Sequence, residues 1–130
     1  MKQINRIKQI ALSWAICISI GALGAHWLKS QLSADKLESF ETGSRYHFYG
    51  NIALLFLVFI ENHFEVKHFN RIYQLMMTGM ILFSGSIYIL ATKEIHGLGF
   101  VKFFGPITPI GGILLILSWI LLFKNIKTKK

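Results

Sequence analysis

The chain has 130 residues, enough for a single domain, and 53% of them are hydrophobic, with a mean hydropathy of +0.50. A soluble domain of this size must cover itself with polar surface, so the composition excludes an ordinary soluble fold and predicts side chains that face lipid. Lys and Arg number 14 against 6 Asp and Glu. Because most of these basic residues stand at the ends of apolar segments, they indicate anionic lipid headgroups, and not nucleic acid, as the partner.

Four apolar stretches follow one another along the chain. Each approaches the roughly 20 residues that a helix needs to cross about 30 Å of hydrocarbon. The expected fold is therefore all-α, an integral membrane four-helix bundle that occupies residues 1–130 as a single transmembrane domain. The four predicted spans are Ile10 to Leu28, Tyr46 to Asn62, Ile72 to Ala91 and Ile107 to Phe123.

The residues between the first and second spans also have helical character. Ser33 is a candidate N-cap, and acidic residues follow it where the helix dipole favours them. We therefore expect a short interfacial amphipathic helix between spans 1 and 2. Gly43 and Ser44 mark a candidate bend before the chain enters the membrane at Tyr46.

The two prolines of the chain, Pro106 and Pro109, stand at the start of the fourth span. The first-turn amides of a helix have no intrahelical partner, so a proline costs no hydrogen bond there. The prolines therefore predict the start of a helix and not a kink within one.

The distribution of Lys and Arg predicts the orientation, because the side richer in these residues faces the cytoplasm. The two tails and the loop between spans 2 and 3 hold nine of them, and the other two loops hold five. Both termini are therefore expected in the cytoplasm. The nine residues are Lys2, Arg6, Lys8, Lys67, Arg71, Lys124, Lys127, Lys129 and Lys130.

A competing interpretation takes residues 1–24 as a cleaved signal peptide. A basic start, an apolar run and the sequence from Ala22 to Gly24 fit that pattern loosely. The apolar run is long for a signal peptide, however, and its glycines and alanines have a use in packing.

Small residues recur within the spans. Lipid tails are as apolar as leucine, so helices in a bilayer associate through close van der Waals contact and hydrogen bonds, which favours small residues where helices meet. The pattern predicts a tight bundle that can also self-associate. The glycines expected at its helix-packing seams are Gly21, Gly24, Gly85, Gly111 and Gly112.

Four short motifs, which follow one another along the chain, resemble those of a known protein family. They run from Gly21 to His26 (GALGAH), Phe40 to Tyr46 (FETGSRY), Leu82 to Tyr88 (LFSGSIY) and Ile107 to Gly112 (ITPIGG). Over nearly its whole length the chain resembles the small membrane family catalogued as domain of unknown function 423. The resemblance implies a four-span protein of the bacterial inner membrane, with relatives in eukaryotic organelles and no established activity.

The most polar face is expected on the helix that leads into the second span. Glu41, Arg45 and Tyr49 are spaced so that they share one side of that helix. If this side turns toward the bundle, Glu41 and Arg45 form a partly desolvated pair, and His26 can join them in a proton relay. These four residues are the candidate functional polar cluster, and His47 is expected on the same membrane face as His26. The alternative is an exposed ion pair, on the order of a few tenths of a kcal/mol, with a histidine that bonds a neighbouring helix.

The sequence has no spacing typical of a metal site, a nucleotide loop or an activated nucleophile, so no cofactor, metal or enzymatic activity is predicted. The favoured hypothesis is a non-catalytic structural or accessory membrane component that packs against itself or a larger complex. The alternative is a small transporter or channel subunit acting as an oligomer, because four helices leave little room for a lumen in one copy. An intramembrane enzyme acting on lipid is a third hypothesis, which depends on His26, Glu41 and Arg45 alone.

Overall fold

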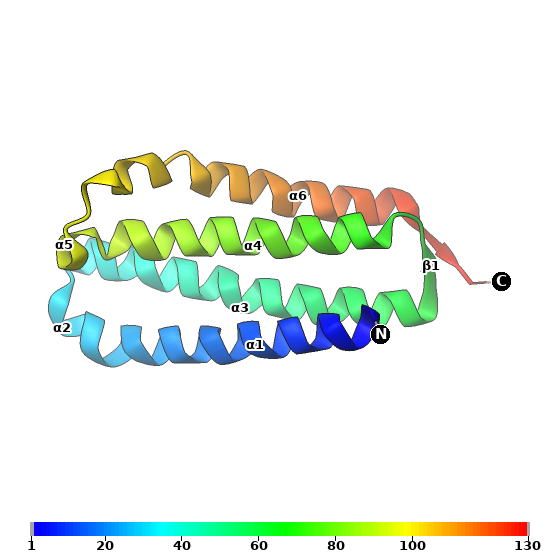
Figure 1. Cartoon of the computed structure of the whole chain (residues 1–130), viewed down its shortest axis with the longest axis horizontal. Helices are drawn as coiled ribbons and strands as arrows, with labels where there is room; N and C mark the ends of the chain where they lie inside the picture. The colour runs from blue at the N-terminus through cyan, green and yellow to red at the C-terminus, as the bar shows by residue number, and fades with distance from the viewer. Residues whose placement is uncertain (1, 130) are drawn as a thin grey trace.

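The computed structural model describes residues 2–129 and is almost entirely helical. Its long helices run back and forth along one axis, so that both ends of the described chain lie toward the same end of the bundle (Figure 1). The long helices are α1 (Lys2–Leu23), α3 (Ala34–His63), α4 (Phe69–Ala91) and α6 (Ile107–Asn125).

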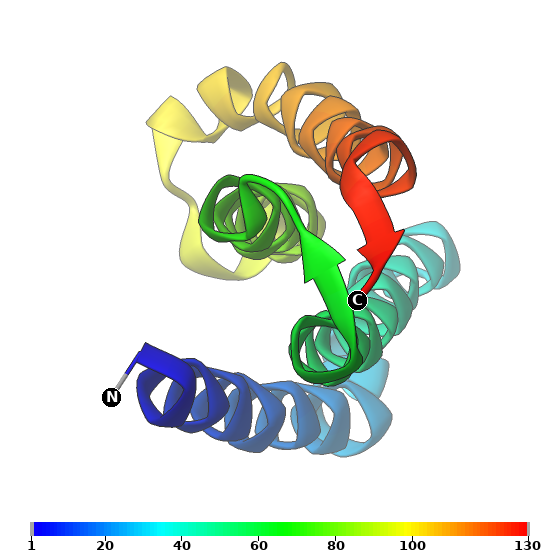
Figure 2. The same ribbon diagram turned by 90° about the vertical axis from the view of Figure 1, so that its right-hand side faces the viewer.

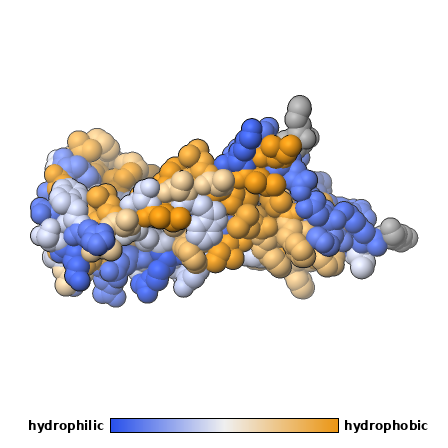
Figure 3. Space-filling model, turned by 90° about the horizontal axis from the view of Figure 1, so that it is seen from below, coloured by the Kyte–Doolittle hydropathy of each residue, from blue (hydrophilic) through white to orange (hydrophobic). Residues whose placement is uncertain are grey.

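Three helical stretches of the described chain are long and apolar enough to cross a membrane: Gln3–Gln31, Phe69–Ala91 and Gly99–Asn125. α3 lies alongside them with 30 residues, and its first half carries the charged side chains between Asp35 and Arg45. On the face shown in Figure 3, apolar side chains gather over the middle and hydrophilic ones toward the two ends. The predicted all-α membrane bundle is therefore confirmed.

A π-helical turn, Gly24–Leu28, and the short helix α2 (Lys29–Gln31) continue α1 almost to the start of α3. At Gly24 the two helices come so close that a Cβ atom would lie 2.6 Å from the ring of Phe40, which only glycine avoids. Ser33 precedes α3 with extended backbone angles, as a helix start requires, but its side chain makes no capping hydrogen bond.

The helix expected as a separate interfacial segment is instead the first part of α3, which continues without a break through Gly43 and Ser44 into the predicted second span. This corrects the expected bend. The reason lies in packing, since a Cβ atom at Gly43 would come within 2.9 Å of Ile87 on α4. Gly43 therefore permits close contact between two helices and does not turn the chain.

Close packing is strongest on α4, which contacts both α3 and α6. A Cβ atom at Gly111 on α6 would overlap the backbone of Phe83 on α4. On the other side of α4, a Cβ atom at Gly50 of α3 would come within 2.6 Å of the side chain of Met80. The hydroxyls of Ser86 and Thr108 add a hydrogen bond of 2.6 Å between α4 and α6. These seams match the packing mode expected of helices in lipid.

The other predicted packing glycines differ from one another. A Cβ atom at Gly21 or at Gly112 would make an ordinary contact of 3.6 Å, with Ser44 and Phe83 respectively. A Cβ atom at Gly85 would meet nothing within 4 Å. Gly85 therefore faces open space, and no other helix of the described chain packs against it.

The remaining connections lie at the two ends of the bundle. α5 (Lys93–His96) and a 3-10 helix (Gly99–Phe104) lead to Pro106, which caps α6, so the predicted start of the fourth helix is confirmed. At the opposite end, β1 (Phe64–Val66) pairs antiparallel with β2 (Ile126–Thr128). This pairing ties the end of the chain to the connection between α3 and α4.

The view along the bundle shows that it is open on one side (Figure 2). α1 packs mainly on α3, α3 on α4, and α4 on α6. The main buried cluster lies toward the end that carries the strands, and it includes Ile10, Leu54, Leu57, Ile72 and Met76, all at most 1% exposed. α1 is thus attached along one flank, and a gap remains between α1 and α4.

Two adjacent glycines of α6 test the importance of its close approach to α4. The Gly111→Ala substitution adds a methyl group that overlaps the backbone of Phe83, so α6 must move away. We expect it to lower the free energy of unfolding by about 1–3 kcal/mol, as overpacking commonly does. Gly112→Ala, whose new Cβ atom would be 3.6 Å from its nearest neighbour, is the matched control and should change little. Denaturant unfolding in detergent measures both, and equal stabilities would contradict the packing described.

Candidate functional site

The predicted polar cluster lies on the outside of the bundle. His26, Glu41, Arg45 and Tyr49 are all exposed. Arg45 donates a hydrogen bond of 3.2 Å to Thr42 of its own helix, and within residues 2–129 no hydrogen bond or ion pair joins any two of the four. The opposite face of α3 is the one that turns inward. A functional role for these four residues stays a prediction.

The buried face of α3 brings a different polar group into the bundle. His47, near the middle of the helix, and Asn51, one turn later, are 8% and 0% exposed. Ser13 of α1 lies against both. Its hydroxyl oxygen is 2.6 Å from Asn51 Oδ1 and 3.0 Å from His47 Nε2. These three side chains join α1 to α3 at a depth where each polar group needs a partner.

The hydrogen-bond directions in this group follow from simple accounting. The Ser13 hydroxyl donates to Asn51 Oδ1, so its oxygen accepts from His47 Nε2–H. A neutral imidazole has one donor and one acceptor nitrogen. In the neutral state of His47, Nδ1 is then the acceptor, and the hydroxyl of Tyr88, at 3.3 Å, donates to it. We call these four residues the His47 network, and it links α4, α3 and α1.

Two polar atoms beside this network have no partner in the described structure. They are the side-chain nitrogen of Asn51 and the hydroxyl oxygen of Ser84 on α4. Both residues are almost completely buried, with 0% and 2% of their surfaces exposed. An unpaired polar group in an apolar surrounding costs about 1–3 kcal/mol. Of these two residues, Ser84 lines the groove described next, and Asn51 does not.

A groove between α1 and α4 opens over the His47 network, on the open side of the bundle seen in Figure 2. Its volume is about 480 Å³. Most of its walls are apolar. α1 contributes Gln9, Leu12, Ser13, Ile16 and Ile20, α3 contributes His47, and α4 contributes Met77, Met80, Ile81, Ser84, Gly85 and Tyr88.

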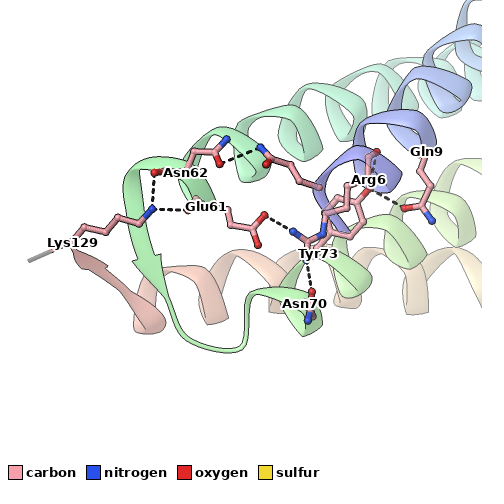
Figure 4. Close-up of polar contacts among 8 residues, drawn as sticks. Arg6, Gln9, Glu61, Asn62, Asn70, Tyr73 and Lys129 are labelled. Atoms are coloured by element: carbon pink, nitrogen blue, oxygen red, sulfur yellow. Dashed lines mark hydrogen bonds and ion pairs between the residues drawn. The ribbon is translucent and has the colours of Figure 1, made fainter. Parts of the chain in front are cut away.

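A second polar group fastens the end of the bundle that carries both tails (Figure 4). The guanidinium of Arg6, whose side chain is only 9% exposed, forms an ion pair with Glu61 of α3 and a hydrogen bond with Asn70 of α4. It also lies over the rings of Phe69 and Tyr73, with centroid distances of 4.7 and 5.4 Å. Arg6 therefore holds the first turns of α1 against two other helices.

Further bonds extend this Arg6 clamp to the strands. The hydroxyl of Tyr73 is 3.3 Å from Gln9 Oε1, and Gln3 donates to Asn62 at 3.1 Å. The ammonium group of Lys129 donates to the backbone oxygens of Glu61 and Asn62, at 3.3 and 2.6 Å (Figure 4). Lys129 thus satisfies carbonyls at the end of α3, which a helix leaves without partners.

The sequence contains a signal for one of the two polar groups, the His47 network, and none for the Arg6 clamp. His47 and Asn51 are polar residues four apart within an apolar run, which indicates a shared face turned toward other helices. Arg6 gives no such signal, since a basic residue before a span is typical of a membrane anchor. Among residues 2–129, no three His, Cys, Asp or Glu side chains are placed to hold a metal ion.

The apolar outer surface, the glycine seams and the buried polar network together define this chain as an all-α integral membrane protein. The sequence pattern of the DUF423 family, described as protein of unknown function, matches residues 20–112. The chain belongs to this family, as the resemblance of its four motifs predicts.

Similar proteins carry names that state a membrane location and no activity. A UPF0382 membrane protein of Staphylococcus saprophyticus is 37% identical over 86% of this chain and 88% of its own length. The UPF0382 membrane protein YwdK of Bacillus subtilis is 34% identical over 86% and 87%. A Haemophilus influenzae UPF0382 membrane protein is 34% identical over 92% of each chain. No solved structure matches the chain.

Replacing Glu61 tests the Arg6 clamp. Glu61→Gln leaves a nearly buried guanidinium without its carboxylate, and Glu61 itself is 33% exposed, so solvent reduces the effect. We expect the free energy of unfolding to fall by about 1–2 kcal/mol, measured by denaturant unfolding in detergent. Glu38→Gln, at an exposed position of the same helix, is the control and should have no effect. A Glu61→Gln protein as stable as wild type would show that the ion pair does not hold α1.

Proposed function

We propose that this chain is a non-catalytic structural or accessory membrane component, which acts by holding another membrane constituent in the groove between α1 and α4. The observation that carries the proposal is the groove itself, about 480 Å³ of mostly apolar space on the open side of the bundle. An apolar molecule that lies in a groove of this size makes packing contacts with the side chains on both of its walls. Such an occupant would complete the packing of α1.

The hydrogen-bond directions support a non-catalytic role. A serine nucleophile must give its proton to a neighbouring base. Ser13 is 3.0 Å from His47, but its proton is directed to Asn51, and His47 donates to Ser13 instead. The hydrogen bonds of the His47 network therefore run in the directions expected of a structural link between helices.

The proposal includes four membrane crossings with both termini in the cytoplasm. α3 has 30 residues, about 45 Å at 1.5 Å per residue, which is long enough to cross beside the other three helices. Both tails and β1 lie toward one end of the bundle, as an even number of crossings requires (Figure 1). In the sequence, nine of the 14 basic residues belong to the two tails and the connection between α3 and α4, which favours a cytoplasmic location for them.

Cysteine labelling in whole cells tests this orientation. With Cys17 replaced by serine, Lys127→Cys should react with a membrane-impermeant maleimide only after the cells are opened. Leu98→Cys, an exposed position at the other end of the bundle, should react in intact cells. The Cys17→Ser protein itself is the unlabelled control. The reverse pattern would place the termini outside.

The accessory role also predicts that the protein, as a homo-oligomer or in a larger membrane complex, carries another membrane constituent with it. A tagged protein purified in mild detergent should elute with a protein mass above that of one 14.9 kDa chain, measured by light scattering. Mass spectrometry of the same fraction should identify partner chains or bound small molecules. A homo-oligomer without other constituents would favour the transport alternative, because a pore needs several copies. A bare monomer would contradict the proposal.

A further inference from the structure

The size of the groove limits what it can hold. One turn of an α-helix, about 5.4 Å long and 10–12 Å across, fills roughly 500 Å³. A groove of about 480 Å³ therefore encloses about the volume of one helical turn, and a longer partner helix would lie mostly outside it. The same volume falls within the range of about 300–1,000 Å³ typical of small-molecule sites.

The shape of the space favours a long molecule. A second hollow of about 340 Å³ lies toward the end of the bundle that carries α5, and it shares Ile20 and Tyr88 with the groove. The walls of this hollow are also mostly apolar, and they extend to Trp27 and Thr92. An apolar chain that starts in the groove can continue between α1 and α4 into the second hollow.

The charge of the walls excludes a strongly charged ligand. None of the residues that line the groove is Lys, Arg, Asp or Glu. An ionised group held there would lack a counter-charge at a depth where charges are costly. Met77 and Met80, which are flexible and polarisable, suit an apolar chain of irregular shape.

Ser84 can supply a hydrogen bond to a molecule in the groove. Several other serine and threonine hydroxyls of the bundle donate to carbonyls of their own helix, as Ser19 does to Ala15 and Thr92 does to Tyr88. The hydroxyl of Ser84 has no partner, although the residue is 2% exposed and lines the groove. A hydroxyl group rotates freely about its C–O bond, so it can donate a hydrogen bond to a hydroxyl or a carbonyl oxygen of a ligand. Next to Ser84, Gly85 leaves open space for such a group.

We propose that the groove between α1 and α4 binds one uncharged, lipid-dissolved molecule, which has a long apolar chain and a hydroxyl or carbonyl oxygen that bonds Ser84. This inference depends on the proposed function, in which the groove holds a membrane constituent. It names the chemical class of that constituent, and it places the polar atom of the ligand within the bundle and the chain along α1.

Photolabelling of the full-length protein in liposomes tests the inference. The probes are hexadecanol and hexadecane, each with the same diazirine on its chain, so that they differ only in the hydroxyl group. Mass spectrometry of the labelled peptides reads the site. The alcohol should label the α1 and α4 residues of the groove about fivefold more than the hydrocarbon, the ratio that one hydrogen bond provides.

Two variants separate the polar and the steric contributions. Ser84→Ala should remove the preference for the alcohol. Gly85→Leu should lower labelling by both probes, since its side chain enters open space and fills the groove. Gly99→Leu adds the same side chain where a Cβ atom also meets nothing within 4 Å, away from the groove, and should leave labelling unchanged.

The outcomes also separate this inference from the proposed function. Equal labelling by the two probes, or undiminished labelling of Gly85→Leu, would overturn the inference. If the purified protein nevertheless carries a partner chain, the accessory function stands and its occupant is of another class. A protein that is monomeric and labelled no more in the groove than on the outer face of α6 would overturn both.

Discussion

The close approach of α4 to its two neighbours is the constraint on which the rest of the structure depends. In lipid, burial of apolar side chains gives little net attraction between helices, so stability must come from contact at short range. Gly111 on one side of α4, and Gly43 and Gly50 on the other, remove the side chains that would keep the backbones apart. α3, α4 and α6 therefore form a unit in which the helices have little freedom to move relative to one another.

α1 is held in another way. It contacts mainly α3, and polar bonds extend from it toward α4 at two levels, the Arg6 clamp at the end of the bundle and the His47 network near its middle. Hydrogen bonds fix distances but do not fill the space between them. The groove follows from this difference, because two helices joined by long side chains stay further apart than two helices joined at glycines.

Much of the fold was predictable from the sequence, because apolar length and proline position are local signals. The helix start at Ile107 and the helical character of the residues after Ser33 both follow from such patterns. The continuity of α3 through Gly43 was not predictable, since a glycine suits a bend and a close contact equally well. The partner that decides between them, Ile87, lies far away in the sequence.

Prediction of the candidate functional site from the sequence meets the same limit, because the contacts that decide it join residues far apart in the chain. The spacing of Glu41, Arg45 and Tyr49 predicts correctly that they share a face, but spacing alone does not say whether that face turns inward. His47 and Asn51 occupy the inward face, and their partner Ser13 comes from a helix that the sequence cannot place beside them. Three-residue strands such as β1 and β2 are too short for any periodicity to indicate them.

The pairing of these strands has a consequence for how the protein is made. β2 follows all of the helices in the chain, whereas β1 lies at its centre, between the second and third long helices. During synthesis β1 must therefore wait, unpaired, until β2 has left the ribosome. The carbonyls at the end of α3 likewise wait for Lys129. The nascent bundle thus stays unfastened at this end until β2 and Lys129 have left the ribosome, so this closure follows the synthesis of all four long helices.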